Sequence, residues 1–160
     1  MPQQIRAVVV DPSVPGRLAI REVSLRDPDR QAEWLAAVRE AASDEGYRLV
    51  INARVDVFLG PFLAGPGAGT QGELVPDALR RAKAYLEAGA DCVYPIVLWE
   101  EDALRQFISG ITAPVNVTRL PQGPSLAELA ALGVARVSWA VLLYRDAMAR
   151  FAEQLASLQG

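Results

Sequence analysis

Residues 92–97 (CVYPIV), 114–118 (PVNVT) and 135–139 (ARVSW) are the three short runs that decide the fold. They are rich in β-branched and aromatic residues, which favour strands. Each run is followed by a segment with a helical pattern, and the runs recur roughly every 22 residues, a compact spacing typical of barrels built from β/α units. Strands that alternate with helices pair in parallel, because the helix carries the chain back to the start of the next strand.

The same alternation extends toward the N-terminus. Residues 5–10 (IRAVVV) and 47–52 (YRLVIN) predict two further strands. Between them, Asp27 followed by Pro28 is typical of a helix start, and Gly46 is typical of a helix end. The Gly/Pro-rich residues 60–72 predict a long loop, and such loops in compact domains are usually functional or mobile.

Helices are predicted over residues 77–88, 100–109 and 142–158, and Ser125 with Glu128 predicts a capping box that begins another helix. The order contains five parallel strands with alternating helices, whereas a closed barrel needs eight. The sequence therefore predicts an α/β fold, a partial TIM-type (β/α) barrel in a single domain over residues 1–160. The near-continuous apolar strands predict that both faces of the sheet are covered.

The composition excludes several functions. The 160 residues include 16 basic and 19 acidic side chains, a net charge of −3, and no histidine. Nucleic acid is an improbable partner, because phosphate binding needs a clustered positive surface. Catalysis by histidine is excluded, and the single Cys92 cannot form an internal disulfide or a multi-thiolate zinc site. Any metal ion would be a hard cation such as Mg²⁺, held by oxygen atoms.

The sequence contains no membrane segment and no targeting signal. No stretch approaches the roughly 18 apolar residues that span a bilayer, and the N-terminal residues lack a basic region followed by an apolar one. We therefore expect a cytoplasmic protein with no membrane partner.

Four motifs at their spacings resemble the isocitrate lyase/phosphoenolpyruvate mutase superfamily, and in particular its uncharacterised bacterial members. They are VINARVD (residues 50–56), EAGADCVYP (87–95), PVNVT (114–118) and PSLAELAALGVARVS (124–138). The resemblance implies that the chain holds strands four to eight of a TIM-type barrel and lacks the first three βα units. It also implies Mg²⁺ as the cofactor and a small 2-oxo or hydroxy carboxylic acid as the ligand. Members of this superfamily cleave or rearrange C–C or P–C bonds through a metal-stabilised enolate.

Three site residues follow from the resemblance. Arg54 matches the arginine that grips the substrate carboxylate, and Asn116 matches an asparagine that several members present to the pocket. Asp11 matches an acidic residue that helps to hold the metal, although Val10 is an alternative match one position earlier. A structural explanation stays open for each residue: Arg54 as the ion-pair partner of Asp56, Asn116 as a core residue bonding a neighbouring strand, and Asp11 as the start of an Asp-Pro turn.

The chain also departs from the superfamily pattern. Residues 12–26 contain neither the cysteine nor the lysine of the catalytic loop, and Ile96 stands where lyases carry a glutamate and mutases a histidine. The principal aspartate ligands of the metal belong to the missing strands. We interpret Cys92 as a small core residue and Arg119 as a loop charge.

Three hypotheses therefore remain: a lyase-like enzyme, a non-catalytic carboxylate-binding module, and the truncated remnant of an enzyme. An open parallel sheet leaves edges uncovered, so we also expect a homo-oligomer, formed through the sheet edges and the apolar face of the C-terminal helix.

Overall fold

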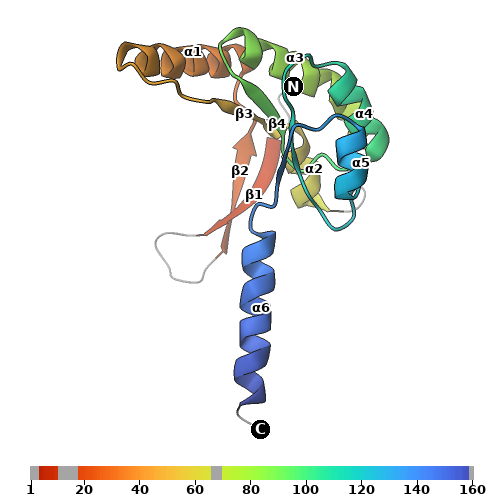
Figure 1. Cartoon of the computed structure of the whole chain (residues 1–160). Coiled ribbons are helices and arrows are strands. Elements are labelled where there is room, and N and C mark those ends of the chain that lie inside the picture. Colours follow the sequence, from red (N-terminus) through yellow and green to blue (C-terminus); the bar gives the residue numbers. More distant parts are fainter. Residues whose placement is uncertain (1–3, 11–17, 66–69, 159–160) are drawn as a thin grey trace.

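The computed structural model describes residues 4–10, 18–65 and 70–158, and of residues 4–10 and 18–24 it describes the backbone only. An α/β body holds most of the chain, and the last helix projects away from it (Figure 1). The elements are β1 (Gln4–Val10), β2 (Leu18–Ser24), α1 (Pro28–Asp44), β3 (Asn52–Val55), η1 (Asp56–Phe58), α2 (Leu59–Ala64), η2 (Gln71–Leu74), α3 (Val75–Glu87), β4 (Cys92–Pro95), α4 (Glu101–Ser109), β5 (Asn116–Thr118), α5 (Leu126–Ala131), β6 (Arg136–Ser138) and α6 (Leu142–Ser157).

Parallel strands form the centre of the body. Strand β3 pairs in parallel with β4, and β5 pairs in parallel with β6. A parallel bridge between Val93 and Val115 aligns the two pairs, so that β4 lies beside β5. The α/β architecture with parallel strands is therefore confirmed.

The predicted five-stranded partial barrel is not what the described residues show. Strand β1 coincides with the predicted strand at residues 5–10, but it pairs antiparallel with β2, and its register runs from Gln4 opposite Ser24 to Val10 opposite Leu18. The apolar run predicts a strand but does not determine its partner, and a neighbouring segment with a similar pattern forms a hairpin with it. Four of the five predicted strands thus occur as parallel strands.

Several local predictions are confirmed because short-range hydrogen bonds determine them. The Asp27 carboxylate accepts hydrogen bonds from the backbone N–H groups of Asp29 and Arg30, and Pro28 begins α1. The Ser125 side chain and Glu128 form both bonds of the capping box at the start of α5. These bonds satisfy N–H groups that have no partner inside the helix.

Other boundaries differ from the predictions. The strand expected at residues 47–52 begins at Asn52, and the expected loop at 60–72 contains most of α2 and the start of η2. Within α1, Trp34 is 56% exposed, whereas Leu35 beside it is buried. Trp34 lies beside the edge of β3 with which no further strand among the described residues pairs.

Arg39 of α1 fastens this helix to the amino ends of β3 and β4. Its Nε and Nη2 donate to the carbonyl oxygen of Gly89 at 3.1 and 2.8 Å, and its Nη1 donates to the carbonyl oxygen of Leu49 at 2.5 Å. Arg39 also forms an ion pair with Asp91, whose carboxylate accepts the backbone N–H of Ile51 at 2.8 Å. One side chain thus joins three separate segments.

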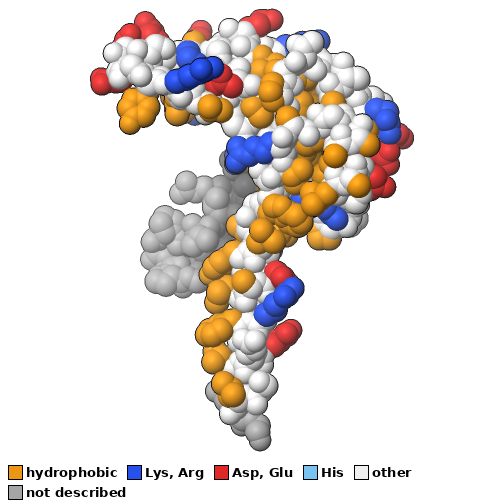
Figure 2. Space-filling model, viewed as in Figure 1, with side chains coloured by type: hydrophobic (Ala, Val, Ile, Leu, Met, Phe, Trp, Pro, Cys, Tyr) orange, Lys and Arg blue, Asp and Glu red, His pale blue; other side chains and the backbone are white. Residues whose placement is uncertain are grey.

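Helix α6 has no buried residue over its 16 positions. Hydrophobic side chains line one side of it (Figure 2). Within the described part of the chain, no helix is both long and apolar enough to cross a membrane.

Candidate functional site

The two faces of the parallel strands differ sharply. Ala53, Val93 and Val115 are register partners, and all three are buried in the hydrophobic core with residues of α3 and α4. Because side chains alternate along a strand, the intervening residues lie on the opposite face. That face carries mainly polar side chains.

Hydrogen bonds between neighbouring strands show which side chains share the polar face. Arg54 of β3 lies opposite Tyr94 of β4, and Thr118 of β5 lies opposite Ser138 of β6. Most of these residues stand at or near the carboxyl ends of their strands, where barrel enzymes carry their sites. We use the name polar face for this set: Arg54, Asp56, Tyr94, Asn116, Thr118 and Ser138.

Arg54 is an exposed cation on the polar face. Its side chain is 53% exposed, and its Nε lies 2.7 Å from Asp56 Oδ1. The Nη2 group donates to Asp56 Oδ2 at 3.3 Å, whereas Nη1 makes no hydrogen bond to any described residue. Asp56 thus occupies one edge of the guanidinium and leaves the other edge available to a ligand.

Arg54 and Asp56 open into a groove along the free edge of β3. The groove has a volume of about 410 Å³, and its lining includes Trp34, Val38 and Val50 beside the two charged residues. A small carboxylic acid would therefore reach Arg54 from solvent.

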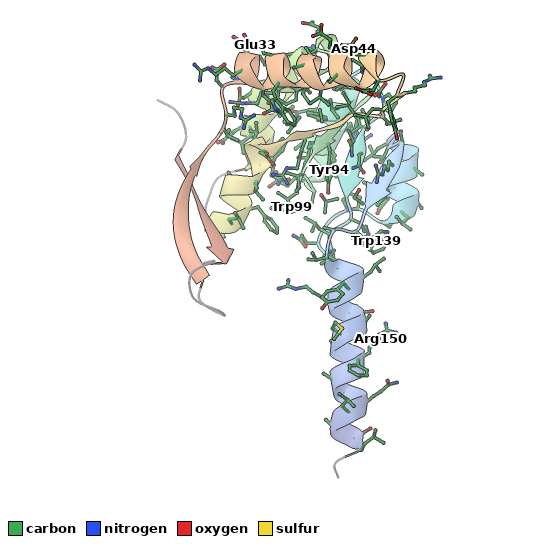
Figure 3. The ribbon with its side chains drawn as sticks, turned by 90° about the vertical axis from the view of Figure 1, so that its left-hand side faces the viewer. Glu33, Asp44, Tyr94, Trp99, Trp139 and Arg150 are labelled. Atoms are coloured by element: carbon green, nitrogen blue, oxygen red, sulfur yellow. The ribbon has the colours of Figure 1, made fainter. Side chains whose placement is uncertain are left out.

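Tyr94 and Thr118 form the centre of the polar face. The Tyr94 hydroxyl lies 2.8 Å from Thr118 Oγ1, which also accepts the backbone N–H of Val97 at 3.2 Å. Thr118 is buried, whereas Tyr94 is half-buried. Figure 3 shows Tyr94 in the middle of the α/β body, above Trp99.

The turn after β4 has an unusual backbone. Val97 has a φ of 57°, a left-handed conformation that is rare for a β-branched residue. Buried Gln71 holds this turn: its Nε2 donates to the carbonyl oxygen of Val97 at 2.8 Å, and its Oε1 accepts the N–H groups of Trp99 and Glu100. Strained conformations of this kind cluster at binding and catalytic sites.

Asn116 is fully buried in the polar face. Its Oδ1 accepts the Ser138 hydroxyl at 3.0 Å, and its Nδ2 has no hydrogen-bond partner among the described residues. Asn52 Oδ1 is a second buried atom without a hydrogen-bond partner among the described residues, and Asn52 alternates onto the same face. Asp56 Oδ1 makes no hydrogen bond either, but it is ion-paired with Arg54 Nε at 2.7 Å. Buried polar atoms without partners are uncommon.

Two of the three predicted site residues, Arg54 and Asn116, share the polar face. Strand β4 lies between their strands, so the two residues are not side by side. Both structural alternatives are also present, because Arg54 pairs with Asp56 and Asn116 bonds the neighbouring strand. Asp11 lies outside the described residues, and its role stays a prediction.

Three residues of the polar face were not predicted as site residues, Tyr94, Thr118 and Ser138. All three belong to strands that the sequence predicts, and the alternation of side chains along each strand was the signal that could have found them. Arg119 folds back onto carbonyl groups of its own turn, Leu120 and Gly123, rather than extending into solvent. Cys92 is buried as predicted, and burial raises the pKa of its thiol.

The model of the phosphoenolpyruvate phosphomutase family matches residues 13–159. The chain belongs to this family. It is 33% identical over 95 residues to 2-methylisocitrate lyase of Bacillus subtilis (strain 168), covering 58% of this chain and 26% of that enzyme. Among solved structures, a protein of Burkholderia cenocepacia J2315 described as a phosphonomutase has 40% identity and a TM-score of 0.74, covering 85% of this chain and 52% of that one.

A third relative was solved with ligands. The complex of phosphonopyruvate hydrolase with oxalate and Mg²⁺ has 26% identity and a TM-score of 0.65, covering 84% of this chain and 45% of the hydrolase. These structural neighbours belong to a superfamily of TIM-type barrels. The chain spans about half of each solved neighbour and less than half of the curated relatives that it matches.

Proposed function

We propose that this chain binds a small 2-oxo or hydroxy carboxylic acid through Arg54. The observation that carries the proposal is the guanidinium of Arg54, which is held by Asp56 on one edge and exposed on the other at the carboxyl end of β3. A planar guanidinium edge matches a carboxylate with two parallel hydrogen bonds. The hydrolase relative solved with oxalate supports this ligand class.

We also propose a reaction of the lyase or mutase type, which cleaves or rearranges a C–C or P–C bond next to a carboxylate. Such chemistry uses Mg²⁺ to stabilise an enolate. The described residues do not fit a Mg²⁺ site: no group of three potential metal ligands converges there, and Asp56 is paired with Arg54. Asp11 is the candidate metal ligand that remains.

A non-catalytic carboxylate-binding module is the second candidate function. The same observation favours it, since an exposed arginine is present in the described part of the chain and a group of metal ligands is not. The truncated remnant of an enzyme, which binds no ligand, is the third candidate.

Calorimetric titration with oxalate, with and without Mg²⁺, tests the proposal. Oxalate resembles the enolate of pyruvate in shape and charge. We expect oxalate to bind, and we expect Arg54→Ala to weaken binding by about 1.5–3 kcal/mol, roughly 10- to 150-fold. Arg105→Ala is the matched control, because Arg105 forms a comparable exposed ion pair with Glu101 on α4.

The outcomes separate the three candidates. Magnesium-dependent binding supports the lyase-like enzyme, and binding that ignores magnesium supports the module. If oxalate does not bind in either buffer, or binds Arg54→Ala as tightly as the parent chain, the proposed function is wrong.

We further propose that two copies of the chain associate through α6. Six exposed hydrophobic residues of α6 and its two flanking positions recur at alternating spacings of three and four, the repeat of a helix that packs along another helix. They are Val141, Tyr144, Met148, Phe151, Leu155 and Leu158. Leu143 is exposed as well but does not follow this spacing.

Light scattering coupled to gel filtration tests this association. We expect a dimer that Phe151→Glu converts to monomers, whereas Glu153→Gln leaves the mass unchanged. A monomeric parent chain would refute the association.

A cytoplasmic location remains part of the proposal, and the single buried thiol is compatible with it.

A further inference from the structure

We infer that the Tyr94 hydroxyl is a second ligand contact, which donates a hydrogen bond to the oxygen-bearing group at the other end of the acid that Arg54 binds. This inference rests on the proposed function, because it needs a carboxylate at Arg54. It adds a residue to the site and narrows the ligand to acids with two adjacent oxygen-bearing groups, such as 2-oxo acids and short dicarboxylates.

The position of Tyr94 comes from the strand register. Tyr94 is the direct partner of Arg54 in the parallel pair β3–β4, so the two side chains leave neighbouring strands at the same level on one face. Neighbouring strands lie about 4.8 Å apart. A ligand of two or three carbon atoms would then lie between the guanidinium and the phenol, over the polar face rather than in the groove along the edge of β3.

The direction of the hydrogen bonds follows from counting donors. Thr118 is buried, and its oxygen already accepts the N–H of Val97. The hydroxyl hydrogen of Thr118 needs an acceptor, and the Tyr94 oxygen at 2.8 Å is the one that the described residues provide. Thr118 therefore donates to Tyr94, and the Tyr94 hydrogen is left to point outward.

The resulting chain of donors runs from Val97 N–H to Thr118, from Thr118 to Tyr94, and from Tyr94 to the ligand. Each bond in such a chain polarises the next, which strengthens the last donor. The left-handed turn at Val97 fixes the first donor, and Gln71 holds that turn. An anionic oxygen is the acceptor that gains most from the final hydrogen bond.

Titration of oxalate and of acetate into Tyr94→Phe tests the inference. We expect Tyr94→Phe to weaken oxalate binding about tenfold and to leave acetate binding within twofold, because acetate has no second oxygen-bearing group. Tyr47→Phe is the matched control, since Tyr47 is an exposed tyrosine outside the groove. Thr118→Val should lower oxalate affinity in the same way, whereas Thr118→Ser, which keeps the hydroxyl, should restore it.

The possible results distinguish this inference from the proposed function. If Arg54→Ala weakens oxalate binding but Tyr94→Phe does not, the contact at Tyr94 is wrong and the carboxylate site stands. Equal losses for oxalate and acetate in Tyr94→Phe would show that the tyrosine acts on the fold of the site, and would overturn the inference. If the parent chain binds no oxalate, both conclusions fail together.

Discussion

Replacing Arg39 by alanine should destabilise the chain more than replacing any exposed arginine of an ion pair. The side chain is only 27% exposed, and it donates to the carbonyl oxygens of Gly89 and Leu49 as well as pairing with Asp91. Losing the charged donor leaves the partly buried carbonyl oxygen of Gly89 without this partner, at about 1–2 kcal/mol, and the exposed one of Leu49 at about 0.5–1 kcal/mol. The partly exposed ion pair adds at most about 1 kcal/mol.

We therefore expect Arg39→Ala to lower the free energy of unfolding by about 2–4 kcal/mol, which corresponds to a melting temperature about 5–15 °C lower for a domain of this size. Thermal and urea denaturation followed by circular dichroism measure both quantities, at one fixed protein concentration because the chain is proposed to associate. Arg39→Lys should recover about half of the loss, since lysine keeps the charge without the planar fork. A change below about 0.5 kcal/mol in Arg39→Ala, the size usual for a surface residue, would refute the reasoning.

Three further predictions concern single positions. Gly89→Ala should destabilise the chain by about 1–3 kcal/mol, because Gly89 has a φ of 98° and an added Cβ would lie 3.2 Å from the Arg39 side chain. Gly72→Ala is the control and should leave the melting temperature unchanged, since an added Cβ there has no atom within 4 Å. Ala140→Gly should stabilise the chain by about 0.5–1 kcal/mol, since Ala140 has a left-handed φ of 48°, which glycine adopts without strain. Ala149→Gly, inside α6, should destabilise it by a similar amount, because glycine is unfavourable in a helix interior; urea titrations measure both changes. The pKa of Asp91 is lowered, chiefly by the backbone N–H that it accepts, so its contribution to stability is present above the unfolded value near pH 4 and is lost as the pH falls through the lower folded value. Asp91→Asn should reduce the loss of stability as the pH falls below about 4, and an unchanged loss would contradict the role given to Asp91.

Local hydrogen bonding explains which parts of the fold were predictable. The caps at Asp27 and Ser125 and the helix end at Gly46 depend on residues within one turn, and all three signals are read directly from the sequence. The strand at residues 4–10 was also predictable, because its β-branched run favours extended backbone. Its antiparallel pairing with β2 was not, since partner choice depends on contacts outside the segment.

Some residues of the candidate site could be selected from the sequence and others could not. Arg54 and Asn116 follow from motifs that resemble known relatives, and the structure puts both on the polar face. Tyr94 gains its importance from the register with Arg54 and from the 2.8 Å contact with Thr118, which is 24 residues away in sequence. Distances between strands do not appear in a motif, so a sequence alone could not select it.

The most direct test of the central claim is a titration of the isotopically labelled chain with oxalate, followed by nuclear magnetic resonance. If Arg54 and Tyr94 bind the acid, the Nε–H of Arg54 and the backbone amides of Arg54, Asp56 and Tyr94 should shift together with a single saturation curve. The amides of α6 and of the Arg39 contacts should stay in place. Shifts spread evenly over the exposed arginines, or no shift at Arg54 at saturating oxalate, would contradict the account.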